Sequence, residues 1–113
     1  MILQRIEVNQ RRLRLMMVGI CQTRAERARG LLLRRWGCST GLLLPACNAI
    51  HTWGMDQPLD LLFCDEQDRI IDMVRGLAPW RFARRSGAHS VWEFRAGAID
   101  ALGFQTGDRI RPC

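Results

Sequence analysis

The residues best suited to chemistry lie close together in the stretch 50–65. His51 is one of two histidines in the chain, and Asp60 stands at the start of the apolar run that follows it. A carboxylate can hold an imidazole in one tautomer, so a hydrolase-like enzyme could use His51 and Asp60 as an acid–base pair. The alternative is a structural histidine whose ring bridges the loop backbone and the core. The sequence leaves both alternatives open, so His51 and Asp60 are candidates only and no catalytic residue is assigned.

The segment between His51 and Asp60 predicts the wall of a binding site. Gly54 and Pro58 interrupt any regular element there, and the segment leads directly into a buried strand. Loops that carry aromatic and polar side chains into such a strand commonly line pockets. The ligand-binding residues expected in this stretch are His51, Trp53, Met55 and Asp60.

Other reactive groups are too scattered to predict a metal or cofactor site. Cys47 lies near His51 in sequence, as a two-residue metal site or a reactive thiol would require, but zinc usually takes three or four protein ligands. Asp65 and Asp68 are ordinary turn residues, and their spacing is not that of a calcium-binding loop. We therefore expect no metal and no cofactor.

The motifs of this stretch resemble those of the DUF192 family of small uncharacterised proteins. The resemblance starts with Ile-His-Thr-Trp-Gly-Met, continues through Pro-Leu-Asp and Phe-Cys-Asp, and ends at Asp65. Upstream, Thr23 to Leu32 is similar to the family segment Thr-x-x-Glu-Arg-x-x-Gly-Leu-Met, with Leu32 in place of the common Met. Further matching positions are Pro79, Trp92-Glu93, Gly97, Leu102-Gly103 and Gly107-Asp108.

This resemblance runs from about Leu13 to Ile110, nearly the whole chain. It implies a compact, mostly β sandwich and carries no established activity. It also suggests Arg27, on a short helix, as the ion-pair partner of Asp60, because a carboxylate in an apolar strand is costly unless it is paired or hydrogen-bonded. Arg27 therefore joins the expected ligand-binding set.

The composition is that of one soluble domain. The chain has 113 residues, of which 48% are apolar and 25% charged, and its net charge is +6. Every basic residue is an arginine, which favours weak electrostatic attraction to nucleic acid and no more. Five irregularly spaced cysteines, with no signal peptide or membrane-spanning run, predict a reduced cytoplasmic protein.

One short stretch adds aromatic rings to this basic charge. Trp80, Arg81 and Phe82 alternate rings with a guanidinium, and Arg84 and Arg85 follow. Such a pattern suits a surface that stacks bases and contacts phosphates. A basic loop with one ring turned inward explains it equally well.

Short apolar runs separated by turn residues predict the fold. We expect a small antiparallel β-sandwich or barrel, jelly-roll-like, with one or two short helices. Residues 1–10 are expected to be a peripheral segment and 11–113 a single domain, with 76–87 irregular. The expected strands are 12–20, 42–44, 59–64, 69–75, 89–95 and 109–111, and the expected helical segments are 24–29 and 97–102.

Three functions are consistent with these features. The first is a binding module for a small ligand or protein partner, with its site on the loop from His51 to Asp60. The second is a small hydrolase-like enzyme that uses these two residues. The third is a basic accessory protein that binds nucleic acid weakly. We expect a monomer or weak dimer.

Overall fold

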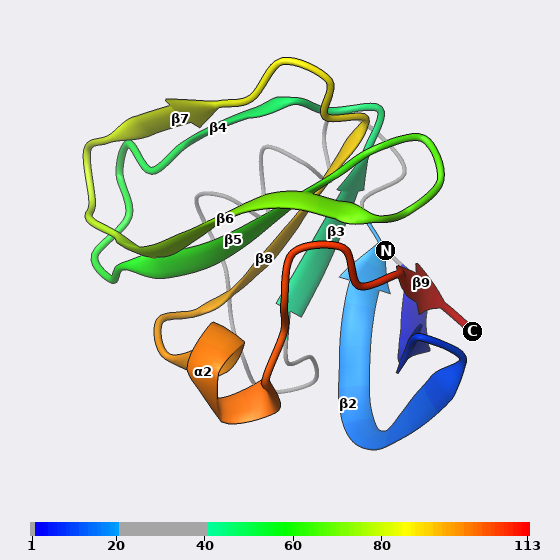
Figure 1. The fold of residues 1–113 in the computed structure, drawn as a ribbon. Coiled ribbons are helices and arrows are strands. Elements are labelled where there is room, and N and C mark those ends of the chain that lie inside the picture. The colour runs from blue at the N-terminus through cyan, green and yellow to red at the C-terminus, as the bar shows by residue number, and fades with distance from the viewer. Residues whose placement is uncertain (1, 21–40) are drawn as a thin grey trace.

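The computed structural model describes residues 2–20 and 41–113, with the side chains of residues 2, 3 and 12–17 left aside. These residues form a mainly β fold with one short helix (Figure 1). The strands are β1 Ile2–Val8, β2 Arg11–Ile20, β3 Gly41–Pro45, β4 Ala49–His51, β5 Leu59–Cys64, β6 Ile70–Leu77, β7 Phe82–Arg84, β8 Ser90–Arg95 and β9 Ile110–Pro112. The helix is α2, Ala98–Leu102.

The described strands form two sheets, which confirms the mainly β class. A seven-stranded sheet has the order β6-β5-β8-β3-β2-β1-β9, and β4 pairs with β7 in a separate two-stranded sheet. The large sheet is mixed, because β2 and β3 run parallel, with Val18 opposite Gly41 and Ile20 opposite Leu43. The expectation of an antiparallel sheet is therefore wrong at this pair. A parallel pair cannot be joined by a tight hairpin turn and needs a longer crossover connection.

Strand β8 lies at the centre of the hydrophobic core. Its alternating side chains enter two separate clusters: Trp92 and Phe94 in one, Val91 in the other. The Phe94 ring packs against that of Phe104, with ring centroids 5.4 Å apart. Neighbouring β5 is likewise buried on both faces, which explains its nearly continuous apolar run.

The predicted hairpin of β5 and β6 is present, and its turn is built around one carboxylate. Oδ1 of Asp65 accepts hydrogen bonds from the backbone N–H groups of Gln67 (2.9 Å) and Arg69 (3.0 Å). Asp68 in the same turn adopts a left-handed φ of 63°, which Asp tolerates better than most residues. These aspartates therefore shape the turn, as the sequence suggests.

The N-terminal segment is more central than predicted. Strand β1 pairs with β2 on one side and with β9 on the other, and Ile6 is fully buried. Residues 2–8 are thus a paired strand of the large sheet rather than a peripheral segment. The alternation of Ile6 and Val8 is the signal, and it is too short to separate a paired strand from a frayed end.

Two further elements bear on the sequence predictions. The helical turn at 97–102 is present as α2, which ends at Gly103 with a left-handed φ of 73°. The helix expected at 24–29 lies outside the described residues. No helix in the described part of the chain has the length and hydropathy to cross a membrane.

Candidate functional site

The two-stranded sheet of β4 and β7 positions the candidate site. In its register, Ile50 is opposite Ala83 and His51 is opposite Phe82. Ile50 and Ala83 are buried against the core, at 2% and 7% exposure. Because side chains alternate along a strand, the pair His51 and Phe82 faces outward. The sequence predicts residues 76–87 to be irregular and 49–51 to be loop, so this pairing corrects both expectations (Figure 1).

An aromatic surface covers this outward face. The His51 and Trp53 rings stack with centroids 4.7 Å apart and planes tilted by 31°. Trp53 is 53% exposed, Phe82 59% and Trp80, on the adjoining loop, 66%. Large apolar side chains rarely gather in the open without a binding role. We use the term aromatic surface for His51, Trp53, Trp80 and Phe82.

The imidazole of His51 has a polar atom without a partner. Nδ1 is buried and makes no hydrogen bond within the described part of the chain. Buried polar atoms in native proteins nearly always have a partner, so an exception needs an explanation. A binding site is one such explanation, because a ligand or a bound water can supply the missing hydrogen bond.

Thr52 is the anchor that holds the aromatic surface in place. It is fully buried, and its Oγ1 donates to the carbonyl of Ala78 (2.6 Å) and accepts from the N–H of Arg81 (2.9 Å). Its backbone carbonyl accepts from Trp80 (3.0 Å) and Met55 (3.2 Å). One side chain and its backbone thus link the loop after β4 to the loop before β7.

The backbone at Trp80 is strained. Its φ is 62°, in the left-handed region that bulky residues seldom occupy, at a cost of roughly 1–2 kcal/mol. The bonds from Thr52 to Trp80 and to Arg81 hold this conformation. Strain of this kind persists where the surroundings over-determine it, and it is frequent at functional sites.

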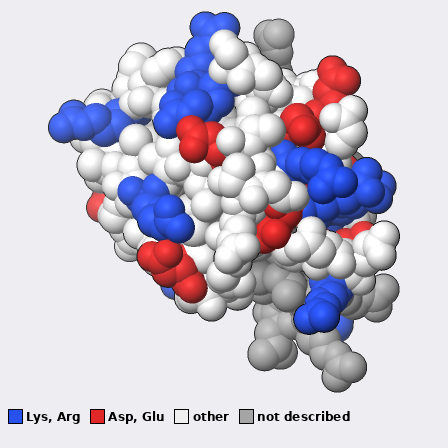
Figure 2. Space-filling model, in the orientation of Figure 1, with Lys and Arg blue, Asp and Glu red and all other residues white. Residues whose placement is uncertain are grey.

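Arginines surround the aromatic surface. Arg81 and Arg84 are exposed, whereas the Arg85 guanidinium bonds to the carboxylate of Asp72 and lies 5.3 Å from the centre of the Phe63 ring. The hydrogen bond from Arg85, aided by the amide of Met73, lowers the pKa of Asp72 from its ordinary value. Figure 2 shows basic side chains on several parts of this face of the molecule, including the end that carries β7.

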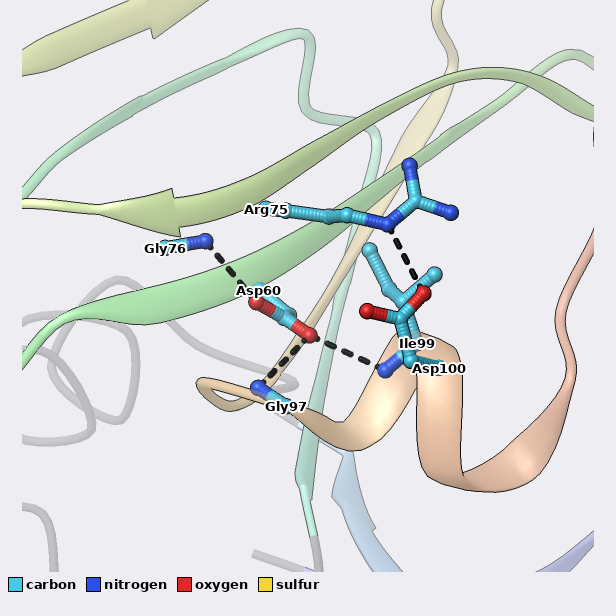
Figure 3. Close-up of polar contacts among 6 residues, drawn as sticks. All are labelled: Asp60, Arg75, Gly76, Gly97, Ile99 and Asp100. Atoms are coloured by element: carbon cyan, nitrogen blue, oxygen red, sulfur yellow. Dashed lines mark hydrogen bonds and ion pairs between the residues drawn. The ribbon is translucent and has the colours of Figure 1, made fainter.

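Asp60 is a buried structural carboxylate. It is 1% exposed, and its oxygens accept hydrogen bonds from the backbone amides of Gly76 (2.9 Å), Gly97 (3.0 Å) and Ile99 (2.9 Å). Two of these amides belong to the start of α2, where N–H groups otherwise lack partners. Asp60 therefore ties β5 to the end of β6 and to the helix (Figure 3).

The predicted pair of His51 and Asp60 is not joined by a hydrogen bond in the described structure. The Asp60 oxygens face the amides of Gly76 and of the start of α2, whereas the His51 ring, on β4 of the small sheet, packs on the Trp53 ring. The predicted ion pair with Arg27 lies outside the described residues. Met55 is half-buried and packs on the core cluster around Ile50.

Cys47 shares a surface groove with the second histidine, His89. The groove has a volume of about 450 Å³ and is lined by Ala46, Cys47, Asn48, Ala49, Ala88 and His89. The Cys47 thiol donates to the carbonyl of Ala49 at 3.1 Å. Within residues 2–20 and 41–113, no group of three His, Cys, Asp or Glu side chains could hold a metal ion.

A second cavity of about 250 Å³ adjoins the large sheet. It is lined by Leu43, Pro45, Ala46, Asp68, His89, Ser90, Trp92 and Pro112. Nearby, burial raises the pKa of the Cys64 thiol to about 12, and the carboxylates of Asp68 and Asp65 act in the same direction. The Cys64 thiol is therefore protonated and inert at neutral pH.

The sequence indicates some of these residues and is silent on others. Trp80, Arg81 and Phe82 stand out as interleaved aromatics and guanidiniums, but nothing in the sequence places them beside His51. The role of Thr52 could not be predicted. In the sequence, Thr52 is merely a polar residue that follows Ile50-His51 at the start of a loop. Polar residues are common in turns, so nothing marks it as an anchor.

Comparison with known proteins gives the chain its family. Residues 5–112 match the DUF192 family, described as Uncharacterized ACR. A UPF0127 protein of Thermococcus sibiricus (strain DSM 12597 / MM 739) is 35% identical over 99 residues, which are 82% of this chain and 64% of that protein. The chain thus matches less than two thirds of that relative's length.

Two crystal structures share the fold. A putative transcription regulator from Sinorhizobium meliloti 1021 has a TM-score of 0.81 and 20% identity, over 98% of this chain and 94% of that one. A protein of unknown function from Novosphingobium aromaticivorans DSM 12444 has a TM-score of 0.78 and 21% identity, over 96% and 84%. At these identities the likeness concerns the fold alone. With the family match over nearly the whole chain, it follows that this protein belongs to the DUF192 family.

Proposed function

We propose that this protein is a binding module that takes a small ligand or a protein partner on the aromatic surface. The observation that carries the proposal is the exposure of Trp53, Trp80 and Phe82 around the His51 ring. A partner that covers exposed indole and phenyl rings removes them from water, and few of their rotamers are lost. They are therefore efficient binding groups.

Rigidity supports the proposal as well. The hydrogen bonds of Thr52 fix both loops of the aromatic surface, and Ile50 and Ala83 fasten the sheet to the core. A surface that is already ordered costs less entropy when it binds. The unpartnered Nδ1 of His51 adds one polar atom that a ligand or a water could satisfy.

The hydrolase alternative receives less support. It depends on proton transfer between His51 and Asp60, and both oxygens of Asp60 are already bonded to backbone amides. A general base must reach the proton it removes, directly or through one water. A binding role needs the exposed rings only.

The indole N–H signals of the tryptophans allow a direct test. A fragment collection is screened by proton–nitrogen correlation NMR, with Trp53 and Trp80 as reporters and Trp92, at 1% exposure, as the internal reference. We expect binding fragments to shift the two exposed indoles and to leave Trp92 in place. The assignment of each indole comes from single Trp→Phe variants.

A matched pair of variants decides the result. Trp53→Ala removes a ring of the aromatic surface, and Leu102→Ala removes an exposed apolar side chain on α2, at 40% exposure, far along the chain. Fragments should lose affinity for the first variant and keep it for the second. Fragments that bind both variants equally, or that shift only signals from the Cys47 groove, would refute the proposal.

A further inference from the structure

Arg81 and Arg84 give the aromatic surface a charge. Arg81 stands between Trp80 and Phe82 in sequence, and Arg84 faces outward with Phe82, two residues away on the same strand. Both arginines are exposed, and neither makes an ion pair with a described carboxylate. By contrast, the guanidinium of Arg85 is paired with Asp72.

The rings of this face belong to residues that are neighbours in the small sheet and its loops. Phe82 is directly opposite His51, where paired Cβ atoms are about 5 Å apart. The His51 ring stacks on Trp53 at 4.7 Å, and the backbone of Trp80 is bonded to Thr52, the residue between them. The face therefore offers exposed flat rings, with the exposed guanidinium of Arg84 on the same side of β7 as Phe82 and exposed Arg81 next to it in sequence.

We propose that this face binds single-stranded nucleic acid, with unpaired bases stacked on the rings and phosphates bound by Arg81 and Arg84. The inference rests on the proposed function in using the same aromatic surface, and it assigns that surface a partner of another class. A partner that combines flat π faces with a negative charge at every unit matches both features of the face. A duplex keeps its bases stacked on one another, and a neutral sugar gains nothing from the guanidinium groups.

This inference goes further than the charge of +6, which by itself predicts only a weak attraction that disappears near physiological salt. Stacking on a ring releases no counterions, so its contribution persists as salt is added. One acidic group, the exposed carboxylate of Asp56, lies in the same loop as Trp53 and opposes the approach of phosphates.

The experiment measures fluorescence anisotropy of labelled strands about twelve nucleotides long, a length within the range that such binding folds cover. Three labelled ligands of equal length are compared: an oligodeoxythymidine, an oligouridine and a DNA duplex. Titrations are run at low salt and again near physiological salt. We expect both single strands to bind more tightly than the duplex, and the ratio between them distinguishes DNA from RNA as the source of the bases. Stronger binding of the duplex would overturn the inference.

Variants separate stacking from charge. Trp53→Ala and Phe82→Ala should each weaken single-strand binding about tenfold, by a similar factor at both salt concentrations. Arg84→Gln should weaken it mainly at low salt and reduce the salt slope by about 0.7, the value for one phosphate bound in a single strand. Asp56→Asn should tighten binding.

Leu102→Ala and Arg11→Gln are the matched controls, since both side chains are exposed and belong to other parts of the chain. Each should bind as the unchanged protein does, and unfolding curves verify that every variant is folded. If the ring variants keep full affinity, binding is diffuse electrostatics and the inference fails. If no strand binds while fragments still require Trp53, the inference fails and the proposed function stands.

Discussion

Replacement of Asp60 by Asn tests the structural role assigned to this carboxylate. The change keeps the volume of the side chain and converts one of its acceptor oxygens into an amino group, which is a donor. Three backbone amides point at the native carboxylate, from Gly76, Gly97 and Ile99. In any orientation of the new amide, its amino group faces at least one of these N–H groups.

The magnitude follows from these hydrogen bonds. A hydrogen bond to a charged group contributes about 1.5–3 kcal/mol net, and a buried donor left without an acceptor costs about 1–3 kcal/mol. In the better orientation of the new amide, one hydrogen bond is lost and the other two are weakened, because their acceptor is no longer charged. We therefore expect the free energy of unfolding to fall by about 3 kcal/mol. The start of α2 should loosen first, because two of the amides belong to it.

Asp100→Asn is the control for this prediction. Asp100 lies on the same helix and pairs with Arg75 at 3.0 Å, but the Arg75 and Asp100 side chains are 53% and 74% exposed (Figure 3). Exposed pairs contribute about 0–1 kcal/mol, so this variant should lose less than about 0.5 kcal/mol. Urea unfolding followed by circular dichroism measures both. Equal losses in the two variants would refute the assignment of Asp60 as a structural anchor.

Other substitutions test single features of the fold. Cys64 should escape alkylation at pH 8 while exposed Cys113 reacts, as peptide mass spectrometry can show. Folding raises the pKa of Cys64 from 9.0 to about 12, so the protonated thiol stabilises the fold fully below pH 9. This stabilisation is lost as the pH rises from 9 to 12. Cys64→Ala should therefore make the free energy of unfolding fall less steeply over this range. The lowered pKa of Asp72 stabilises the fold above the ordinary carboxyl pKa, so Asp72→Asn should weaken the pH dependence of acid unfolding, by under about 1 kcal/mol at this exposed site. Gly41→Ala should destabilise by about 1–3 kcal/mol in urea unfolding, because its Cβ would lie 2.6 Å from the carbonyl oxygen of Glu93.

The large sheet was predictable where burial dictates the residue types. Strand β5 is buried on both faces, and its apolar run, interrupted only by Asp60, signals this directly, whereas β8 is marked by its large apolar residues Val91, Trp92 and Phe94. The turn between β5 and β6 was predictable because Asp65 bonds to amides two and four residues ahead, a purely local interaction. Local chemistry and burial are what a single sequence records best.

The small sheet was not predictable, because neither local interactions nor a long buried run marks its strands in the sequence. Strands β4 and β7 have three residues each, below the usual strand length, and they are far apart in the chain. The positive φ of Trp80 interrupts the pattern just before β7. Tertiary interactions, chiefly those of Thr52, decide this pairing, and the sequence offers no periodicity from which to infer it.

The partners of Asp60 show a second limit of sequence reasoning. A buried carboxylate must be satisfied, and the search for a partner naturally turns to cations, which led to Arg27. The described hydrogen bonds of Asp60 all come from backbone N–H groups, which every residue except proline carries. The need for a partner could be predicted, but these donors could not, because an amide has no signature in the sequence.

Asp60 and Thr52 together explain how the stretch 50–65 is organised. Both are polar and buried, and both bond to the backbone of segments distant in sequence: Asp60 to the amides around α2, Thr52 to the loop before β7. Thr52 and Asp60 therefore hold the fold together, whereas the Trp53 ring is left outside and Phe63 is the buried ring of the stretch. For Thr52, Asp60 and Trp53 this reverses the usual expectation that aromatic residues build the core and polar residues lie at the surface. It also means that the exposed rings can be changed with little effect on stability, which is the property a variable binding surface requires.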